Sequence, residues 1–475
     1  MKNPSQTAGV RPGVVLAVTS LAAFMASLDL FIVNVAFDAI GRDLRGSSTG
    51  SLSWVLNGYA IVYAALLVPL GRLADRSSRK GGFLLGLVVF TAASAACAVS
   101  TTLPALVTFR LLQAVGAAAL TPTSLGLLLP VFAPGKRAGA VRVWAATGAL
   151  AAAFGPVAGG LLVELSWRWV FLVNLPIGLA ALVAAVRFVP DSRDPVRGPL
   201  PDLLGAALVA VSVGAVALAL VEGGAWGWGS ARTVGGLAVF VVTAALFWRR
   251  SLRHPVPVVE PALLAVRAFA WSNVTSLAFS VAFAGNLLVG ILWMQRGWGY
   301  SALRTGLAVA PGPLMVPVFA LVGGLALKRG LPVGVLAGAG CVLFAAAGLL
   351  TAYRIGLHPA YATELLPSQL LGGTGVGLAL PTILSAATAD LPAERAATGS
   401  AVVSMARQIG SVLGVSVVVA LIGTPLTRTA AHPAFQHAWI ACAAASTLAA
   451  VTAIGMTPRR SSHVALGSPL MEAAR

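Results

Sequence analysis

Three charged residues stand inside long apolar runs of the sequence, namely Asp29, Arg110 and Arg407. An ionised and unpaired carboxyl group in hydrocarbon costs on the order of 3 kcal/mol. Asp29 is therefore expected to line a cavity, to pair with a base or to take up a proton, because desolvation favours the protonated form. These are the properties of a reversible proton carrier. The alternative is a packing aspartate with a fixed partner.

The positions of Arg110 and Asp29 predict that their side chains can meet. Arg110 lies about six residues, roughly 9 Å, from one end of its apolar run, and Asp29 lies about nine residues, roughly 14 Å, from the end of its run at the same face. An arginine stays charged, so Arg110 can tune a carboxyl group but cannot carry the proton. We expect a direct or water-mediated pair, unless backbone carbonyl groups neutralise Arg110 at a packing site. Arg407 either binds an anionic group or locks helices together.

Further polar residues inside or at the ends of apolar runs are candidates for lining a cavity. Each of them is also explained by a hydrogen bond between helices, and Glu222 also by a solvated helix cap. These residues are Asn34, Asn57, Tyr59, Tyr63, Gln113, Glu222, Asn286, Gln295 and Gln369.

The composition places these residues in membrane helices. The chain has 475 residues, 58% of them hydrophobic and 10% charged, with a mean hydropathy of +0.90. Its net charge of +18 is too dispersed for a nucleic-acid surface. Runs of about 20 apolar residues predict an all-α membrane protein rather than a barrel. The fourteen expected spans are 14–38, 52–71, 81–101, 104–131, 138–163, 168–188, 203–221, 233–248, 269–294, 304–327, 332–352, 363–389, 399–423 and 434–456.

The basic residues predict the orientation of these spans. Most of the 32 Lys and Arg residues fall in the segments that share a side with the N-terminus. The positive-inside rule then places both termini in the cytoplasm of a multi-pass protein of the cell membrane. Tryptophans gather at the opposite loop ends, where an outer headgroup layer would anchor them. They are Trp167, Trp169, Trp226, Trp228, Trp293 and Trp298.

A weak internal repeat predicts the domain organisation. Pro122-Thr123 matches Pro381-Thr382, and Gly155 matches Gly414 at the same spacing. The repeat joins the fourth expected span to the twelfth, with two additional spans between the copies. We expect an N-terminal six-helix bundle at 1–201, a two-helix insert at 202–249, and a C-terminal six-helix bundle with a tail at 250–475.

The loop after the second span is basic and carries Gly71, Asp75, Arg76, Arg79 and Lys80. It resembles the G-x-L-x-D-R-x-G-R-[KR] signature of the major facilitator superfamily, which implies a cytoplasmic gate. A loop that only sets topology is the alternative. Ser78 stands where that signature has Gly, so a turn with positive φ is less comfortable there. Leu327 replaces the acid in the second half, and gate chemistry is expected in the first half alone.

Four further motifs resemble the fourteen-helix drug:proton antiporters of that superfamily. Residues 28–36 read L-D-L-F-I-V-N-V-A, and residues 110–116 read R-L-L-Q-A-V-G. Trp167 begins a W-R-W-V-F…N-L-P-I-G segment. The antiporter motif, in which small residues allow close helix contact and Pro bends the helix, is formed by Gly155, Pro156, Gly159 and Gly160. A generic glycine contact is the alternative.

This resemblance implies a proton-coupled efflux transporter that exports drugs or antibiotics by alternating access. An uptake or metabolite transporter of the same superfamily is the alternative, and a membrane sensor or assembly factor is a third reading. The expected partners are the lipid bilayer, a lipophilic small-molecule substrate and the proton gradient. We expect neither an ATPase domain nor nucleic acid as a partner, since there is no G-x-x-x-x-G-K-[ST] sequence. Cofactors, metal ligands and catalytic residues are not expected either, because the histidines and cysteines share no ligand spacing.

Overall fold

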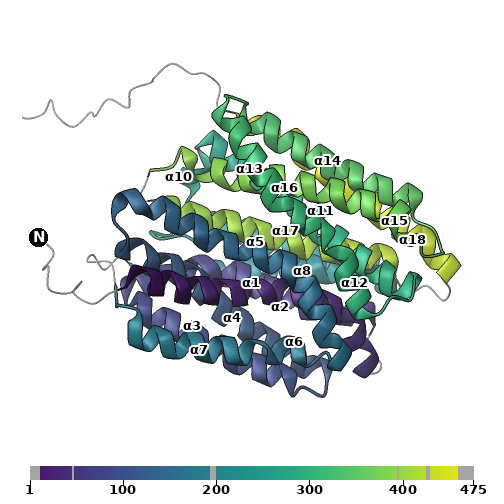
Figure 1. Ribbon diagram of the computed structural model, residues 1–475, viewed down its shortest axis with the longest axis horizontal. Coiled ribbons are helices and arrows are strands. Elements are labelled where there is room, and N and C mark those ends of the chain that lie inside the picture. Colours follow the sequence, from purple (N-terminus) through teal and green to yellow (C-terminus); the bar gives the residue numbers. More distant parts are fainter. Residues whose placement is uncertain (1–10, 45–47, 193–198, 393–394, 424–427, 458–475) are drawn as a thin grey trace, which may run out of the picture.

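The computed structural model describes residues 11–44, 48–192, 199–392, 395–423 and 428–457, and these are helical with no β-strand among them (Figure 1). The helices of the first half and the insert are α1 (Pro12–Asp43), α2 (Thr49–Arg76), α3 (Arg79–Ala98), α4 (Leu103–Leu128), α5 (Pro134–Leu165), α6 (Trp169–Leu172), α7 (Asn174–Phe188), α8 (Leu203–Trp226) and α9 (Ala231–Ser251). Those of the second half are α10 (Pro261–Leu264), α11 (Arg267–Leu292), α12 (Ala302–Val309), α13 (Pro311–Lys328), α14 (Val333–Arg354), α15 (Tyr361–Glu364), α16 (Leu366–Ala389), α17 (Ala396–Ile422) and α18 (Arg428–Ala453).

Fourteen of the described helical segments are long and apolar enough to cross a membrane, which confirms the predicted number of spans. One boundary error is at the first span, which was expected to end near residue 38. Helix α1 instead continues to Asp43. Its last turns carry Asp38 and Arg42, whose side chains pair at 3.4 Å across one helical turn. A polar extension of this kind has no hydropathy signal, because it leaves the apolar layer while it remains helical.

The helices form two bundles of six spans with two additional spans, the major facilitator fold. Helices α1–α7, in purple and blue, fill the lower part of Figure 1, and α11–α18, in green and yellow, fill the upper part. Helix α8 packs on both bundles, since Val209 and Val213 share a buried cluster with Ala60 of α2 and Val412 of α17. Helix α9 packs on α8 and is largely exposed, as expected for a helix that faces lipid.

The two bundles repeat the same helix contacts. A Cβ atom on Gly86 of α3 would lie 3.1 Å from the carbonyl oxygen of Gly116 of α4, and one on Gly340 of α14 would lie 2.7 Å from that of Gly375 of α16. Gly116 in turn approaches the backbone of Phe90, as Gly375 approaches that of Phe344. These matched contacts are the structural counterpart of the weak sequence repeat.

The two ends of the molecule differ in how the bundles meet. We call the end with Arg76, Arg79 and Lys80 the basic end, and the other, with Trp167 and Trp298, the tryptophan end. At the tryptophan end, Arg296 donates to Asp38 at 2.9 Å and Gln295 donates to the Val35 carbonyl group at 3.1 Å. These contacts join α1 to the turn after α11 and close the space between the bundles at that end.

The tryptophans do not all serve as headgroup anchors, contrary to expectation. Trp228 is 56% exposed and Trp169 is 46% exposed, as an anchor would be. Trp293 and Trp167 are buried instead. The Trp293 ring packs in a cluster with Phe435 and Trp439, and the Trp167 indole donates to Asp43 at 2.8 Å. Trp293 and Trp167 therefore pack in the protein interior instead of anchoring a headgroup layer.

Candidate functional site

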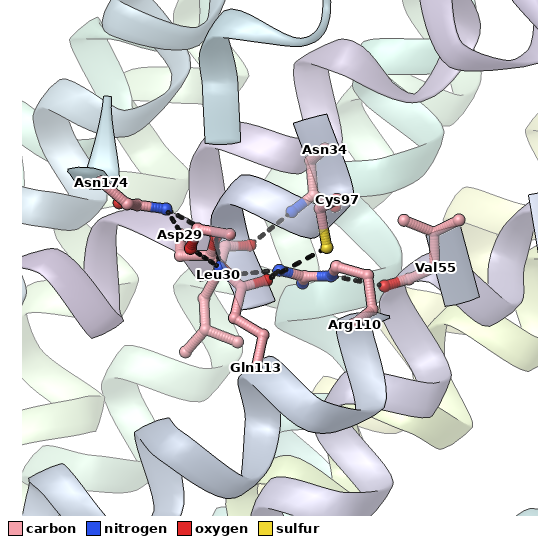
Figure 2. Close-up of polar contacts among 9 residues, drawn as sticks. Asp29, Leu30, Asn34, Val55, Cys97, Arg110, Gln113 and Asn174 are labelled. Carbon is pink, nitrogen blue, oxygen red and sulfur yellow. Dashed lines mark hydrogen bonds and ion pairs between the residues drawn. The ribbon is translucent and has the colours of Figure 1, made fainter. Parts of the chain in front are cut away.

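Asp29 and Arg110 form a direct ion pair in the interior of the first bundle. The guanidinium Nη1 of Arg110 donates to the Oδ2 atom of Asp29 (Figure 2). Asp29 is 0% exposed and Arg110 is 1% exposed. Helix α1 supplies the acid and α4 the base, at the depths expected from their positions in the two apolar runs. Of the two forms expected from the sequence, the structure has the direct pair.

The second carboxylate oxygen of Asp29 has partners of its own. Gln113 donates to Oδ1 at 2.8 Å, and Asn174 of α7 donates to the same atom at 3.2 Å. Gln113 also donates to Ser94 of α3 at 2.7 Å. Asp29 is thus held from two neighbouring helices, α4 and α7, as Figure 2 shows for Gln113 and Asn174. Ser94 and Asn174 were not among the predicted site residues, although Asn174 lies in the W-R-W…N-L-P-I-G motif.

Arg110 is bound by groups other than the acid. Its Nε atom donates to the Val55 carbonyl oxygen at 3.1 Å, and Nη1 also donates to Gln113 at 2.7 Å. The guanidinium carbon lies 4.1 Å from the centre of the Tyr59 ring, in a cation–π contact. Arg110 therefore keeps three partners even when Asp29 is neutral. Of the two expectations for Arg110, the structure has the pair with the acid, and the bond to the Val55 carbonyl group is additional to it.

The contacts around the pair divide between its two members. The guanidinium group and two amide groups donate to the Asp29 carboxylate, whereas Val55, Gln113 and Tyr59 contact Arg110 independently of Asp29. The ion pair itself joins α1 to α4.

Arg407 lies apart from this network, on α17 of the second bundle. Its side chain is half-buried and has no hydrogen bond or ion pair with any residue that the structure describes. Tyr63 of α2 lies within range of its electrostatic field. Of the two expectations for Arg407, a lock between helices has no contact in this structure to support it.

Several of the other polar candidates form side-chain hydrogen bonds within the protein. Asn57 donates to Ser416 of α17 at 3.1 Å and so joins the two bundles. Tyr63 bonds to Thr121 at 2.9 Å, and Asn34 donates to the Leu30 carbonyl group of its own helix at 2.8 Å. These are hydrogen bonds within the protein rather than open cavity positions.

The side chains of three candidates form no hydrogen bond with another residue that the structure describes. Asn286 on α11 is half-buried, and Glu222 lies beside Gly50 near one end of α8. Gln369 packs on Gly312, where an added Cβ would be 3.3 Å from its Oε1 atom. Of the three, Asn286 is the one at mid-helix depth.

The basic loop between α2 and α3 is tied to neighbouring helices. Arg79 pairs with Asp75, and Lys80 donates to the Val186 carbonyl group of α7 at 2.9 Å. Gly71 allows close contact with α4, because an added Cβ would lie 2.9 Å from Pro122. Arg76 has partners as well. Ser78 does not adopt a turn with positive φ, in agreement with the expectation for serine at this position, since its φ is −154° and its hydroxyl caps α3 by accepting from Gly81 at 2.7 Å.

A further contact joins the bundles at the basic end. Arg72 donates to Glu260 at 2.6 Å, and Arg395 approaches the same carboxylate at 3.7 Å. Glu260 precedes α10 in the second bundle, whereas Arg72 belongs to α2 in the first. Sequence reasoning missed this contact because the two residues lie far apart in the chain.

The glycines of the predicted antiporter motif lie against both bundles. An added Cβ would be 2.6 Å from Phe31 at Gly155 and 2.9 Å from the Ile32 carbonyl oxygen at Gly159, so this face of α5 fits closely on α1. At Gly160 it would be 2.6 Å from the Ala302 carbonyl oxygen of α12. Pro156 lies inside α5 between these glycines. Helix α5 therefore bridges the two bundles at the tryptophan end.

The chain resembles a large group of transport proteins. The model of the Major Facilitator Superfamily matches residues 19–415. The chain is 35% identical over 417 residues to multidrug resistance protein Stp of Mycobacterium tuberculosis (87% of this chain, 76% of the relative). It is 32% identical over 413 residues to the tetracenomycin C resistance and export protein of Streptomyces glaucescens (86% and 75%). It is 34% identical over 427 residues to the puromycin resistance protein pur8 of Streptomyces alboniger (89% and 83%).

Solved structures share the fold at lower identity. A POT family transporter in complex with 5-aminolevulinic acid has a TM-score of 0.69 at 16% identity, covering 94% of this chain and 96% of that one. A bacterial homologue of the human lysosomal transporter Spinster, inward-facing and unoccupied, has a TM-score of 0.64 at 16% identity, covering 95% and 99%.

Proposed function

Because the chain belongs to the major facilitator superfamily, we propose that it is an efflux transporter that exports drugs or antibiotics and is driven by protons. Its relatives are named for multidrug resistance, tetracenomycin C export and puromycin resistance, and the match spans most of each chain. The observation that carries proton coupling is the fully buried Asp29, held by Arg110 and two amide side chains.

The coupling step follows from these contacts. A proton that reaches Asp29 neutralises it and weakens its bond to Arg110, while Val55, Gln113 and Tyr59 retain the guanidinium group. The Asp29 contacts that join α1 to α4 and α7 then loosen, and the bundle can change its packing. Release of the proton on the other side restores the pair. Alternating access requires two such discrete arrangements of one bundle against the other.

The orientation and the moving parts are part of this proposal. The basic end faces the cytoplasm and the tryptophan end faces outward, since the basic loops cluster on one side. The loop with Asp75 and Arg79 acts as the cytoplasmic gate, and Gly155 and Gly159 form the smooth face on which α5 rocks against α1. The bundles extend over 1–201 and 250–475, with 202–249 as the insert.

Transport into inverted membrane vesicles tests the proposal. An exporter accumulates a fluorescent drug when the vesicle lumen is acidified, whereas an uptake carrier does not. Asp29→Asn should reach the membrane in normal amount, because the amide fits the same space, yet its uptake driven by the pH gradient should fall to that of vesicles without the protein. The matched control is Asp390→Asn, which alters an exposed acid at the basic end. Full transport by the Asp29→Asn variant would exclude Asp29 from coupling.

A further inference from the structure

Helix α17 carries a polar face that the coupling step does not use. We call it the α17 stripe and define it as Ser400, Ser404, Arg407 and Ser411. Steps of four, three and four residues place all of them on one side of a helix. The same side continues toward the tryptophan end with apolar residues, which are Val415, Val418 and Ile422.

The stripe faces the space between the two bundles. Val415 continues its line and lies in a buried cluster with Ile32 and Val35 of α1, and Val418, farther along, lies beside Gly285 of α11. Ala401, at the basic end of α17, packs on a cluster of the first bundle that contains Tyr63. The other contacts of α17 lie on either side of the stripe. Gly410 and Gly414, three and seven residues after Arg407, contact α11, and Ser416, on the opposite side of the helix, bonds to Asn57 of α2. The stripe therefore lies between the contact with α11 and the contact with the first bundle.

Exposure changes along this face in one direction. Ile422 is 3% exposed, Val418 0% and Val415 6%. The next residues toward the basic end, Ser411, Arg407 and Ser404, are half-buried, and Ser400 is exposed. The space between the bundles is therefore closed at the tryptophan end and becomes accessible toward the basic end.

The charge of Arg407 is not compensated by the described residues. Asp29 is fully buried and bound to Arg110, and Glu260 at the basic end is bound to Arg72 at 2.6 Å. Tyr63, whose hydroxyl bonds to Thr121 at 2.9 Å, is the titratable group within its electrostatic range. A guanidinium group that is held at membrane depth without an acid provides a fixed positive charge for a ligand.

We propose that the α17 stripe binds the anionic group of the transported substrate, so that the transporter selects lipophilic organic acids. The Arg407 guanidinium donates two parallel hydrogen bonds to a carboxylate, the geometry it favours. The hydroxyl group of Ser404, one turn away, donates a further bond, whereas that of Ser411 donates to the Arg407 carbonyl group of its own helix at 3.0 Å. This inference rests on the proposed efflux function and specifies its substrate class.

Binding to the purified full-length protein tests the charge preference without depending on transport. The probes are fluorescein and fluorescein methyl ester, which differ by one carboxylate, together with the cation rhodamine 123, and the readout is fluorescence anisotropy. The wild-type protein should bind fluorescein most tightly. Arg407→Gln should weaken fluorescein binding roughly tenfold or more and change binding of the ester by no more than about twofold, since a charge-assisted hydrogen bond is lost for the acid alone. Arg407→Lys should recover part of the affinity because the charge is kept.

Two results would overturn the proposal. One is a wild-type protein that binds the ester or rhodamine 123 as tightly as fluorescein. The other is an equal loss for acid and ester in Arg407→Gln, which would indicate a structural role. The matched control is Arg354→Gln, an exposed arginine at the end of α14, which should leave all three affinities unchanged. A failed efflux function would appear separately, as absent transport driven by the pH gradient despite selective binding.

Discussion

The two bundles share their helix contacts but not their charges. The contact of Gly155 with Phe31 in the first bundle matches that of Gly414 with Val281 in the second, which places Phe279 at the position of Asp29. Gly116 and Gly375 make matching contacts in the two bundles. Arg110 and Gln369 each lie six residues before one of these glycines, so Gln369 occupies the position of Arg110.

The second bundle therefore has an apolar core where the first has an ion pair. The Phe279 ring meets that of Phe344 at 5.3 Å between centroids, and Phe279 is 1% exposed. Conversely, Arg407 of α17 corresponds to Gly148 of α5. The two bundles thus share one backbone arrangement but differ in their charges. The first holds the titratable group Asp29, and the second holds Arg407, whose charge no described residue compensates. A protein that couples protons to a substrate has reason to keep these charges on different moving parts.

The largest expected difference between the bundles is at Arg110 and its counterpart Gln369. Arg110→Gln leaves Asp29 buried without its base, and we expect a loss of about 3–5 kcal/mol in stability together with loss of transport. Gln369→Ala should cost about 1 kcal/mol or less, as it removes no charge partner. Thermal unfolding of the purified variants in detergent measures both. Equal destabilisation by the two substitutions would contradict the division of charge.

A smaller difference is expected between two glycines of α5. Gly155→Ala brings a Cβ atom within 2.6 Å of Phe31. Overpacking of this kind costs about 1–3 kcal/mol. Gly148→Ala is the matched control, because its nearest neighbour, the Ser27 hydroxyl, would be 3.8 Å away. There the substitution should stabilise the helix by up to about 1 kcal/mol. Opposite shifts in unfolding temperature are expected, and a stabilising Gly155→Ala would refute the close α1–α5 fit.

The smallest expected difference is between the two loops at the basic end. The first bundle begins α3 with a Ser78 cap, and the second passes into α14 through Gly330, whose φ is +90°. Ser78→Ala should cost about 1 kcal/mol through loss of the cap. Gly330→Ala should cost about 1–2 kcal/mol through left-handed strain. Ser78→Gly should change stability by only a few tenths of a kcal/mol, and a gain of more than that would show that the turn at Ser78 is strained after all.

Much of the fold was predictable from the sequence, because hydrocarbon imposes helices on long apolar runs. The fourteen spans followed from this constraint, and the similar depths of Asp29 and Arg110 in their runs showed that the two side chains can meet. What hydropathy could not supply was the polar extension of α1 to Asp43 and the burial of Trp293, since neither depends on local composition. The cap at Ser78 was missed for another reason. The family signature has glycine at this position, and comparison with it did not suggest that a serine side chain would cap the following helix.

The sequence by itself determined that this chain spans a membrane and that three charged residues remain inside it, because the order of residues gives the type of each charge and its position within an apolar run. Only the tertiary structure decided how those charges are used. Asp29 and Arg110 come from helices far apart in the chain, and the bundle closes them with Gln113, Asn174 and Ser94. Arg407 has no described acid within reach, which depends on what the opposite bundle presents to it. Such pairing is a property of distances between helices, and a linear sequence does not contain these distances.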